Sequence, residues 1–121
     1  MSRHKVMVVE DDVDIREALI EILEENGCEA VGASNGERAL AYLRSTDSLP
    51  CLILLDLMMP VMDGQAFREV QIQDPVLANI PIVVVSAYRD VESHAENLKA
   101  AHYIKKPPRI EELVSAIDQH C

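Results

Sequence analysis

Ionisable and hydroxyl side chains follow four of the short apolar stretches of this chain. Carboxylates follow the first and third stretches, a hydroxyl follows the fourth and two lysines follow the fifth: Glu10, Asp11, Asp12, Asp56, Ser86, Lys105 and Lys106. Carboxylates gathered in one crevice repel one another and raise one another's pKa unless a cation balances them. Oxygen ligands suit Mg²⁺, which keeps several waters and is usually held by one or two carboxylates. These residue types therefore predict a Mg²⁺ site, at which Mn²⁺ is an acceptable substitute.

The ligands of the predicted metal site come from the first and third apolar stretches. We expect Asp11 and Asp56 to bind the metal directly, while Glu10 acts through water. A backbone carbonyl just past Asp56, that of Met58, completes the protein ligands. A transition-metal site is not expected, because the histidines lie far from these positions or lack paired ligand spacing.

A carboxylate beside Mg²⁺, a lysine and a hydroxyl is also the equipment of phosphoryl transfer. In that reaction catalysis is mostly positioning and charge neutralisation. Asp56 is then the nucleophile, and the Lys106 ammonium screens charge on the phosphoryl oxygens. The Ser86 hydroxyl donates a hydrogen bond to one of those oxygens.

Each of these side chains also has a structural explanation. Asp11 or Asp12 can cap the helix that follows, Asp63 can cap a later helix, and lysines near a proline are usually solvated. Taken singly, each structural explanation is the better one. Asp56 is harder to explain in this way, because an acid that ends the wholly apolar run Leu52–Leu55 gains little beyond a turn. The joint occurrence at four strand ends favours a functional site.

The elements that would position these residues alternate along the whole chain. Strands are predicted at Val6–Val9, Ala30–Ala33, Leu52–Leu55, Ile82–Val85 and Tyr103–Ile104. Amphipathic segments separate them, which is typical of βαβ units around a parallel sheet. The fold class is α/β: a flavodoxin-like, doubly wound, five-stranded sheet of order 2-1-3-4-5 with five helices. Without repeat or linker, residues 1–121 are expected to form a single domain.

The helices are predicted from their apolar spacing. The first turns Ile15, Ala18, Leu19, Ile22 and Leu23 inward and ends at Asn26-Gly27. The second runs from Gly36 to Arg44, and the third starts at Asp63-Gly64. The fourth helix is expected within residues 89–99, where the apolar spacing is the weakest of the five. The last runs from Arg109 to Gln119 and should bury the stripe Ile110, Leu113, Val114 and Ile117.

Composition excludes several classes of protein. A formal charge of −10 argues against direct nucleic-acid binding, which needs a clustered basic surface. The apolar runs are too short to cross a membrane, and the N-terminus resembles no secretion signal, so a cytoplasmic protein is expected. The cysteines Cys28, Cys51 and Cys121 are odd in number and lack CxxC spacing, so neither a disulfide framework nor a zinc knuckle is expected. They fit a reducing cytosol.

Four runs of residues resemble the receiver family of two-component signalling, the CheY-like superfamily. They are Val8-Val9-Glu10-Asp11-Asp12, Leu54-Leu55-Asp56-Leu57-Met58-Met59-Pro60 with Met62-Asp63-Gly64, Val85-Ser86-Ala87, and Tyr103-Ile104-Lys105-Lys106-Pro107. The resemblance implies a signalling switch that accepts a phosphoryl group on Asp56 from a histidine kinase or phosphotransfer protein. It favours Lys106 over Lys105, because the family's lysine directly precedes proline, and it implies a cis Lys106–Pro107 bond.

The resemblance also implies how the switch is read. Phosphorylation would draw Ser86 towards the phosphoryl group, and Tyr103 would rotate into the vacated space. Tyr103 as a plain core residue is the competing explanation. The readout face would be built by the fourth helix, fifth strand and fifth helix, for a downstream protein, an output domain or a phosphorylation-dependent homodimer.

The chain departs from the family's pattern in two places. Pro108 stands where phenylalanine is common, and Lys99-Ala100-Ala101-His102 lacks the usual glycine before the last strand. Two positions that tune self-dephosphorylation in the family correspond to Met58 and Tyr88. Neither side chain readily orients an attacking water, so slow self-dephosphorylation is expected.

Three alternatives have a weaker basis in the sequence. A phosphohydrolase with Asp56 as nucleophile would need a second acid two residues later, where Met58 stands. A flavin or nucleotide binder would need a glycine- or hydroxyl-rich loop after the first strand. A pseudo-receiver would signal without phosphate, although the acceptor residues are present. The leading interpretation is a signalling domain that catalyses only its own phosphoryl transfer and hydrolysis, not a metabolic enzyme.

Overall fold

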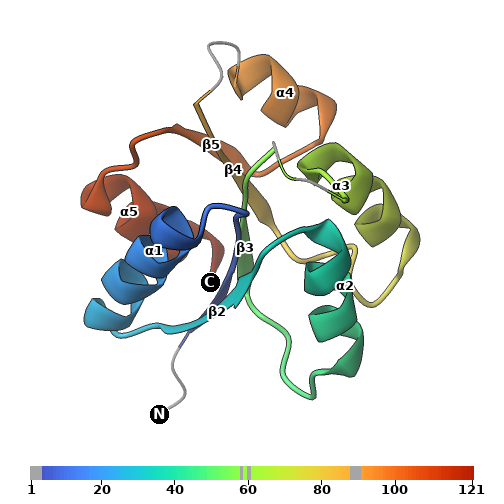
Figure 1. The fold of residues 1–121 in the computed structure, drawn as a ribbon, viewed down its shortest axis with the longest axis horizontal. Helices are drawn as coiled ribbons and strands as arrows, with labels where there is room; N and C mark the ends of the chain where they lie inside the picture. Colours follow the sequence, from blue (N-terminus) through green and yellow to red (C-terminus); the bar gives the residue numbers. More distant parts are fainter. Residues whose placement is uncertain (1–3, 58, 60, 88–90) are drawn as a thin grey trace.

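The computed structural model describes residues 4–57, 59, 61–87 and 91–121, and strands alternate with helices throughout that part of the chain (Figure 1). In chain order the elements are β1 Lys5–Val9, α1 Val13–Glu25, β2 Glu29–Ala33, α2 Gly36–Ser45, β3 Leu52–Leu55, α3 Gly64–Gln73, β4 Ile82–Ser86, α4 Val91–Asn97, β5 His102–Lys105 and α5 Ile110–His120. These bounds differ from the predicted ones by a few residues at most. Every described helix is too short or too polar to cross a bilayer.

The strands form one parallel sheet in the order β2-β1-β3-β4-β5, which confirms the predicted fold class and strand order. Helices α1 and α5 cover one face, and α2, α3 and α4 cover the other (Figure 1). Successive residues of β3 point alternately into the two apolar layers: Leu52 and Leu54 into the first, Ile53 and Leu55 into the second. Because both faces are covered, the strand is apolar at every position.

Two of the predicted aspartate caps are present. The Oδ1 atom of Asp12 accepts hydrogen bonds from the backbone N–H groups of Asp14 and Ile15, at 2.9 and 3.1 Å. Asp63 caps α3 in the same way, accepting from the N–H of Ala66 at 2.8 Å. Of the two residues that could cap α1, Asp11 and Asp12, it is therefore Asp12 that does so.

The buried stripes of α1 and α5 differ in part from the prediction. Ala18 is exposed, and Ile110 is 51% exposed. On α5 the buried residues are Leu113, Ala116 and Ile117, with Val114 half-buried at their border. A helix that lies on a sheet buries a stripe narrower than its full apolar arc, so where two apolar rows compete only the packing decides which one faces inward.

The end of α4 explains one departure from the family pattern. Lys99 has a φ of 56°, its N–H donates to Glu96 O at 3.1 Å, and the N–H of Ala100 donates to Ala95 O at 2.9 Å. This is the bonding pattern of a helix end closed by a left-handed residue, a position that glycine fills most easily. The guanidinium of Arg68, on α3, donates to Leu98 O at 2.9 Å and to Lys99 O at 3.1 Å. Arg68 therefore fastens this turn to α3.

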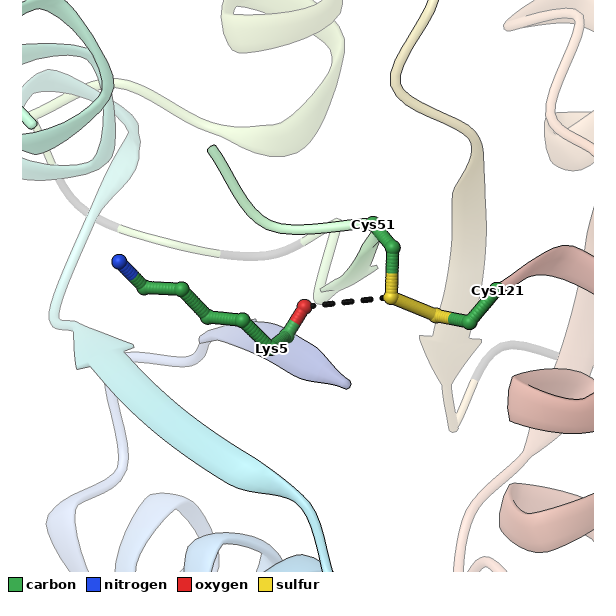
Figure 2. The surroundings of a disulfide bond; sticks show 3 residues. All are labelled: Lys5, Cys51 and Cys121. Carbon is green, nitrogen blue, oxygen red and sulfur yellow. Dashed lines mark hydrogen bonds between the residues drawn. A yellow bond between two sulfur atoms is a disulfide. The ribbon is translucent and has the colours of Figure 1, made fainter. Parts of the chain in front are cut away.

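A disulfide joins Cys51 to Cys121, so the expectation of no disulfide is wrong (Figure 2). Cys51 precedes β3 and Cys121 follows α5, 70 residues apart in the chain, and their Cα atoms are 5.3 Å apart. Cys28 is the free cysteine, and it is buried. The prediction failed because the number and spacing of cysteines in the sequence do not show which two thiols the fold brings together.

Reduction of the Cys51–Cys121 disulfide should lower the free energy of unfolding by about 2–4 kcal/mol, because the bond limits the unfolded chain over a long loop. Urea denaturation with and without a dithiol measures the difference. Cys28→Ser should respond to the dithiol as the wild type does. An unchanged midpoint in the reduced wild type would contradict the prediction.

Lys99→Gly should raise the free energy of unfolding by about 1 kcal/mol, because glycine adopts the left-handed conformation without the steric cost of a Cβ. Thermal or urea denaturation gives the value. Lys99→Ala is the matched control: it removes the same side chain, keeps the Cβ and should gain nothing. Equal stabilisation by both variants would show that the lysine side chain, not the backbone, is responsible.

Candidate functional site

The acidic residues meet because their strands are hydrogen-bonded neighbours in register. Val9 lies opposite Leu55, so the next residues, Glu10 and Asp56, leave the sheet side by side. Backbone bonds hold both: Glu10 N donates to Ala33 O, and Asp56 N donates to Val9 O, each at 3.0 Å. Both residues are buried, with 2% of Glu10 and 7% of Asp56 exposed.

Lys106 reaches the two buried carboxylates from the end of β5. Its Nζ lies 2.5 Å from Glu10 Oε1 and 3.5 Å from Asp56 Oδ2. Its backbone N–H donates to Ser86 O at 2.9 Å, which ties it to the last residue of β4. Lys105 is exposed and makes none of these contacts among the described residues. The Lys106–Pro107 bond is cis, as the family resemblance implies.

These residues line an open cavity of about 360 Å³ at the carboxyl ends of the strands. Its walls are Glu10, Asp11, Asp12, Ile15, Asp56, Ser86, Ala87 and Lys106. Ser86 is buried, with 2% of its surface exposed. The strand order reverses between β1 and β3, and ligands of open α/β sheets bind outside such a point.

The carboxylates fit a hard divalent cation. Glu10, Asp11 and Asp56 each offer one oxygen, and these oxygens lie within 4.8 Å of one another. Four carboxylates and one ammonium line the cavity among the described residues, so the local charge is negative. An all-oxygen set of this size, open to water on one side, suits Mg²⁺ or Mn²⁺. Met58 is predicted to supply a backbone carbonyl ligand, and Met58 and Tyr88 are both predicted to tune self-dephosphorylation. Both residues lie outside the described part of the chain.

The ionisation of the site reflects its crowding. Burial raises the pKa of Glu10, and the neighbouring Asp56 raises it further, while Lys106 opposes both effects. The pKa of Asp11 is raised by desolvation and by Glu10. Burial alone would lower the pKa of Lys106, but Glu10 and Asp56 outweigh it and the net direction is upwards. The lysine is therefore held as an ammonium, and the carboxylates would ionise more readily beside a second cation.

Two residues, Arg16 and Gly64, support the site in ways that the sequence analysis does not predict. Arg16 is not named there, and Gly64 is named only as part of a motif and at the start of a helix. The Nη1 atom of Arg16, on α1, donates a hydrogen bond to the backbone oxygen of Glu10 at 2.8 Å and so fixes the backbone of Glu10. Gly64 donates its N–H to Leu57 O at 3.1 Å, and a Cβ on Gly64 would lie 2.7 Å from Asp56 O. The start of α3 thus packs directly on the loop that carries Asp56, which only glycine allows. In the sequence, the Asp63-Gly64 pair was the feature that could have indicated this close packing.

Tyr103 is half-buried on β5, opposite Val84 of β4. Its side chain packs against the apolar layer under α2, α3 and α4. Its ring centroid lies 5.5 Å from that of His102. This packing agrees with the explanation of Tyr103 as a core residue in this conformation, and its role as a moving switch residue stays a prediction.

Comparisons of sequence and of fold relate this chain to the same group of proteins, the response regulators. The family model of the response regulator receiver domain matches residues 6–118. Over 115 residues the chain is 35% identical to the phosphate regulon transcriptional regulatory protein PhoB of Klebsiella pneumoniae, covering 93% of this chain and 49% of that protein. Sporulation initiation phosphotransferase F of Bacillus subtilis is 29% identical over 123 residues, which cover 99% of this chain and 95% of that protein.

Among solved structures, a response regulator receiver protein from Pseudomonas putida superposes with a TM-score of 0.88 at 30% identity, covering 98% of each chain. A putative response regulator from Chloroflexus aurantiacus gives the same TM-score at 28% identity. The chain spans about half the length of the first curated relatives that it matches.

Lys106→Met should lower the free energy of unfolding by about 1–3 kcal/mol in metal-free buffer, because it leaves the buried carboxylates without their ammonium partner. Urea denaturation in a chelator gives the value. Mg²⁺ should restore part of the loss. Lys105→Met, which changes an exposed lysine, is the matched control, and an equal loss in that variant would contradict the assignment.

Proposed function

Because this chain belongs to the response-regulator receiver family, we propose that it is a phosphoacceptor switch in which Asp56 accepts a phosphoryl group. The observation that carries the proposal is the position of Lys106 Nζ, between the buried carboxylates of Glu10 and Asp56. Family membership supports a signalling domain of two-component systems. The contact with Lys106 and the position of Asp56 directly after β3 support Asp56 as the acceptor.

The proposed reaction is a displacement at phosphorus. An oxygen of the Asp56 carboxylate bonds to phosphorus while the bond to the imidazole nitrogen of a phosphohistidine donor breaks, and the nitrogen keeps the electron pair. The Lys106 ammonium balances negative charge on the transferred group and pairs with a phosphoryl oxygen afterwards. The Ser86 hydroxyl donates a hydrogen bond to another phosphoryl oxygen. Burial of Asp56 excludes bulk water from the side of the carboxylate that faces the sheet.

Glu10, Asp11 and Asp56 would hold Mg²⁺ or Mn²⁺, together with the carbonyl of Met58, with Glu10 acting through water. When bound, the metal supplies positive charge that lowers the repulsion between acceptor and donor. Arg16 and the hydrogen bond from Asp56 N to Val9 O keep the two strand ends in place during this step. Asp12 is occupied as a helix cap and has no proposed role in the reaction.

The proposed readout is a shift between two packings of the face made by α4, β5 and α5. Ser86 would move towards the phosphoryl group, and Tyr103 would follow into the space that it leaves. The kinase or phosphotransfer protein is the upstream partner, and a downstream protein, an output domain or a second copy of the chain reads the changed face. We place this exchange in the cytoplasm, where histidine kinases present their phosphorylated domains.

A pseudo-receiver that signals without phosphate is the second candidate. It predicts the same fold, but gives no reason for an ammonium held against a buried acceptor carboxylate. The phosphohydrolase alternative is weaker still, because it needs an acid at position 58, which is methionine.

Incubation with Mg²⁺ and acetyl phosphate should add one phosphoryl group to the protein, detected by intact mass. Mg²⁺ removal, Asp56→Asn and Lys106→Met should each abolish or greatly slow the addition, whereas Lys105→Met should not. Once the donor is removed, the adduct should decay slowly, in keeping with Met58 and Tyr88 at the tuning positions. No adduct from acetyl phosphate or from a phosphorylated histidine donor, in a folded protein that binds Mg²⁺, would favour the pseudo-receiver.

A further inference from the structure

A second cluster of potential ligands lies at the opposite edge of the sheet from the acidic site. His4, Cys51 and Cys121 each offer one ligand atom, and these atoms lie within 4.8 Å of one another. His4 precedes β1, Cys51 precedes β3 and Cys121 follows α5. Glu10 and Asp56 follow the same two strands, so a strand length, roughly 15–20 Å, separates the two clusters.

The three residues stand on backbone that is fixed by hydrogen bonds. His4 O accepts from Glu29 N at 2.8 Å, Cys51 N donates to Lys5 O at 2.9 Å, and Cys121 N donates to Ile117 O at 2.9 Å. The pairing of β1 with β2 and β3, and the last turn of α5, therefore bring the ligand atoms together. Ligands held on strand and helix ends, rather than on a free loop, need little reorganisation to bind an ion.

The neighbouring cation points away from the sulfur atoms. The side chain of Lys5 extends from β1 on the side opposite the disulfide (Figure 2). Its Nζ donates to Ser48 O at 2.7 Å and lies 5.0 Å from the centre of the Tyr42 ring. The ammonium therefore points away from the two sulfur atoms (Figure 2).

Disulfide bonding and metal binding exclude each other at this cluster. In the disulfide, the two sulfur atoms are bonded to each other, so neither is available as a thiolate ligand. With the bond broken, two thiolates and one imidazole make a Cys₂His set, which Zn²⁺ prefers and which leaves a fourth position open. Two sulfur ligands of one tetrahedral zinc lie about 3.8 Å apart, since each Zn–S bond is about 2.3 Å. The Cα atoms are 5.3 Å apart, so rotation about the two Cα–Cβ bonds would be enough for this opening.

We propose that His4, Cys51 and Cys121 form a thiol-dependent binding site for Zn²⁺ or a similar borderline-soft divalent ion, closed by the disulfide and opened by reduction. A cellular dithiol is the reductant: its two sulfur atoms become a disulfide, and its two electrons and two protons convert the Cys51–Cys121 bond into two thiols. The ion then displaces the two thiol protons. Both cysteines are half-buried, so a small dithiol can reach them.

This site is separate from the proposed phosphoryl chemistry in both place and ligand type. The acidic cluster offers hard oxygens to Mg²⁺, whereas this cluster offers two sulfurs and a nitrogen. Reversible disulfides of cytosolic proteins are usually redox-sensing, which agrees with the cytoplasmic location proposed above. Loss of one site should leave the other intact.

The test uses the full chain and Co²⁺ as the probe, because thiolate ligation gives Co²⁺ a near-ultraviolet charge-transfer band that oxygen ligands do not. The protein is reduced, freed of reductant under inert gas, and titrated with Co²⁺ in excess Mg²⁺, which fills the acidic cluster. Reduced wild type should develop the band with one Co²⁺ per chain, and the oxidised protein should not. Zn²⁺ should then displace the Co²⁺ and remove the band.

Variants identify the ligands. Cys51→Ser and Cys121→Ser should abolish the band, and His4→Gln should weaken Co²⁺ binding by more than roughly tenfold, the scale of losing even an outer-shell partner. Cys28→Ser and His102→Gln, at residues outside the cluster, are the matched controls and should bind as the wild type does. Circular dichroism of each reduced variant checks that it is folded.

Three results would overturn the proposal: no thiolate band in reduced wild type, a band that survives Cys121→Ser, or the same loss in Cys28→Ser as in the cluster variants. Phosphoryl addition at Asp56, measured on the same samples, should be equal in wild type and in Cys121→Ser. That readout separates failure of the metal site from failure of the proposed switch.

Discussion

The contact of the Lys106 ammonium with the buried carboxylates of Glu10 and Asp56 is the interaction on which the acidic edge of the sheet depends. Each carboxylate loses most of its hydration in that position, and the cost is offset only if positive charge is close by. The contact requires β1, β3 and β5 to end at the same level. The carboxylates that line the cavity outnumber the one ammonium among the described residues, so the site retains net negative charge that suits a divalent cation.

The parallel sheet meets this requirement through its register. Val9 opposite Leu55 aligns the two acidic ends, and Val85 opposite Ile104 aligns β4 with β5. β5 is not a neighbour of β1 or β3, so the length of the lysine side chain closes the remaining distance. Behind Asp56, the close approach of Gly64 keeps the following loop and α3 against the strand end. Backbone packing thereby limits where the Asp56 carboxylate can lie.

The same strands carry different chemistry at their two ends. The carboxyl ends of β1 and β3 gather oxygen ligands and a lysine, and their amino ends gather sulfur and imidazole beside the end of α5. Strands that run in parallel bring all their starts to one edge and all their ends to the other, so two unlike clusters can form without contact. The apolar strand interiors, buried on both faces, keep them apart.

The sequence by itself determined the fold class, because apolar strands and amphipathic helices are local patterns. The strand order followed from the topology rules for parallel βαβ units. The family motif also singled out Lys106 over Lys105, and the structure places it against Glu10 and Asp56. Only the tertiary structure decided the buried stripe of α5, where Ala116 replaces Ile110, and the contact of Arg16 with Glu10 O. It alone paired Cys51 with Cys121 across 70 residues. Helix rotation, side-chain reach and cysteine pairing depend on distances between elements, which no local pattern encodes.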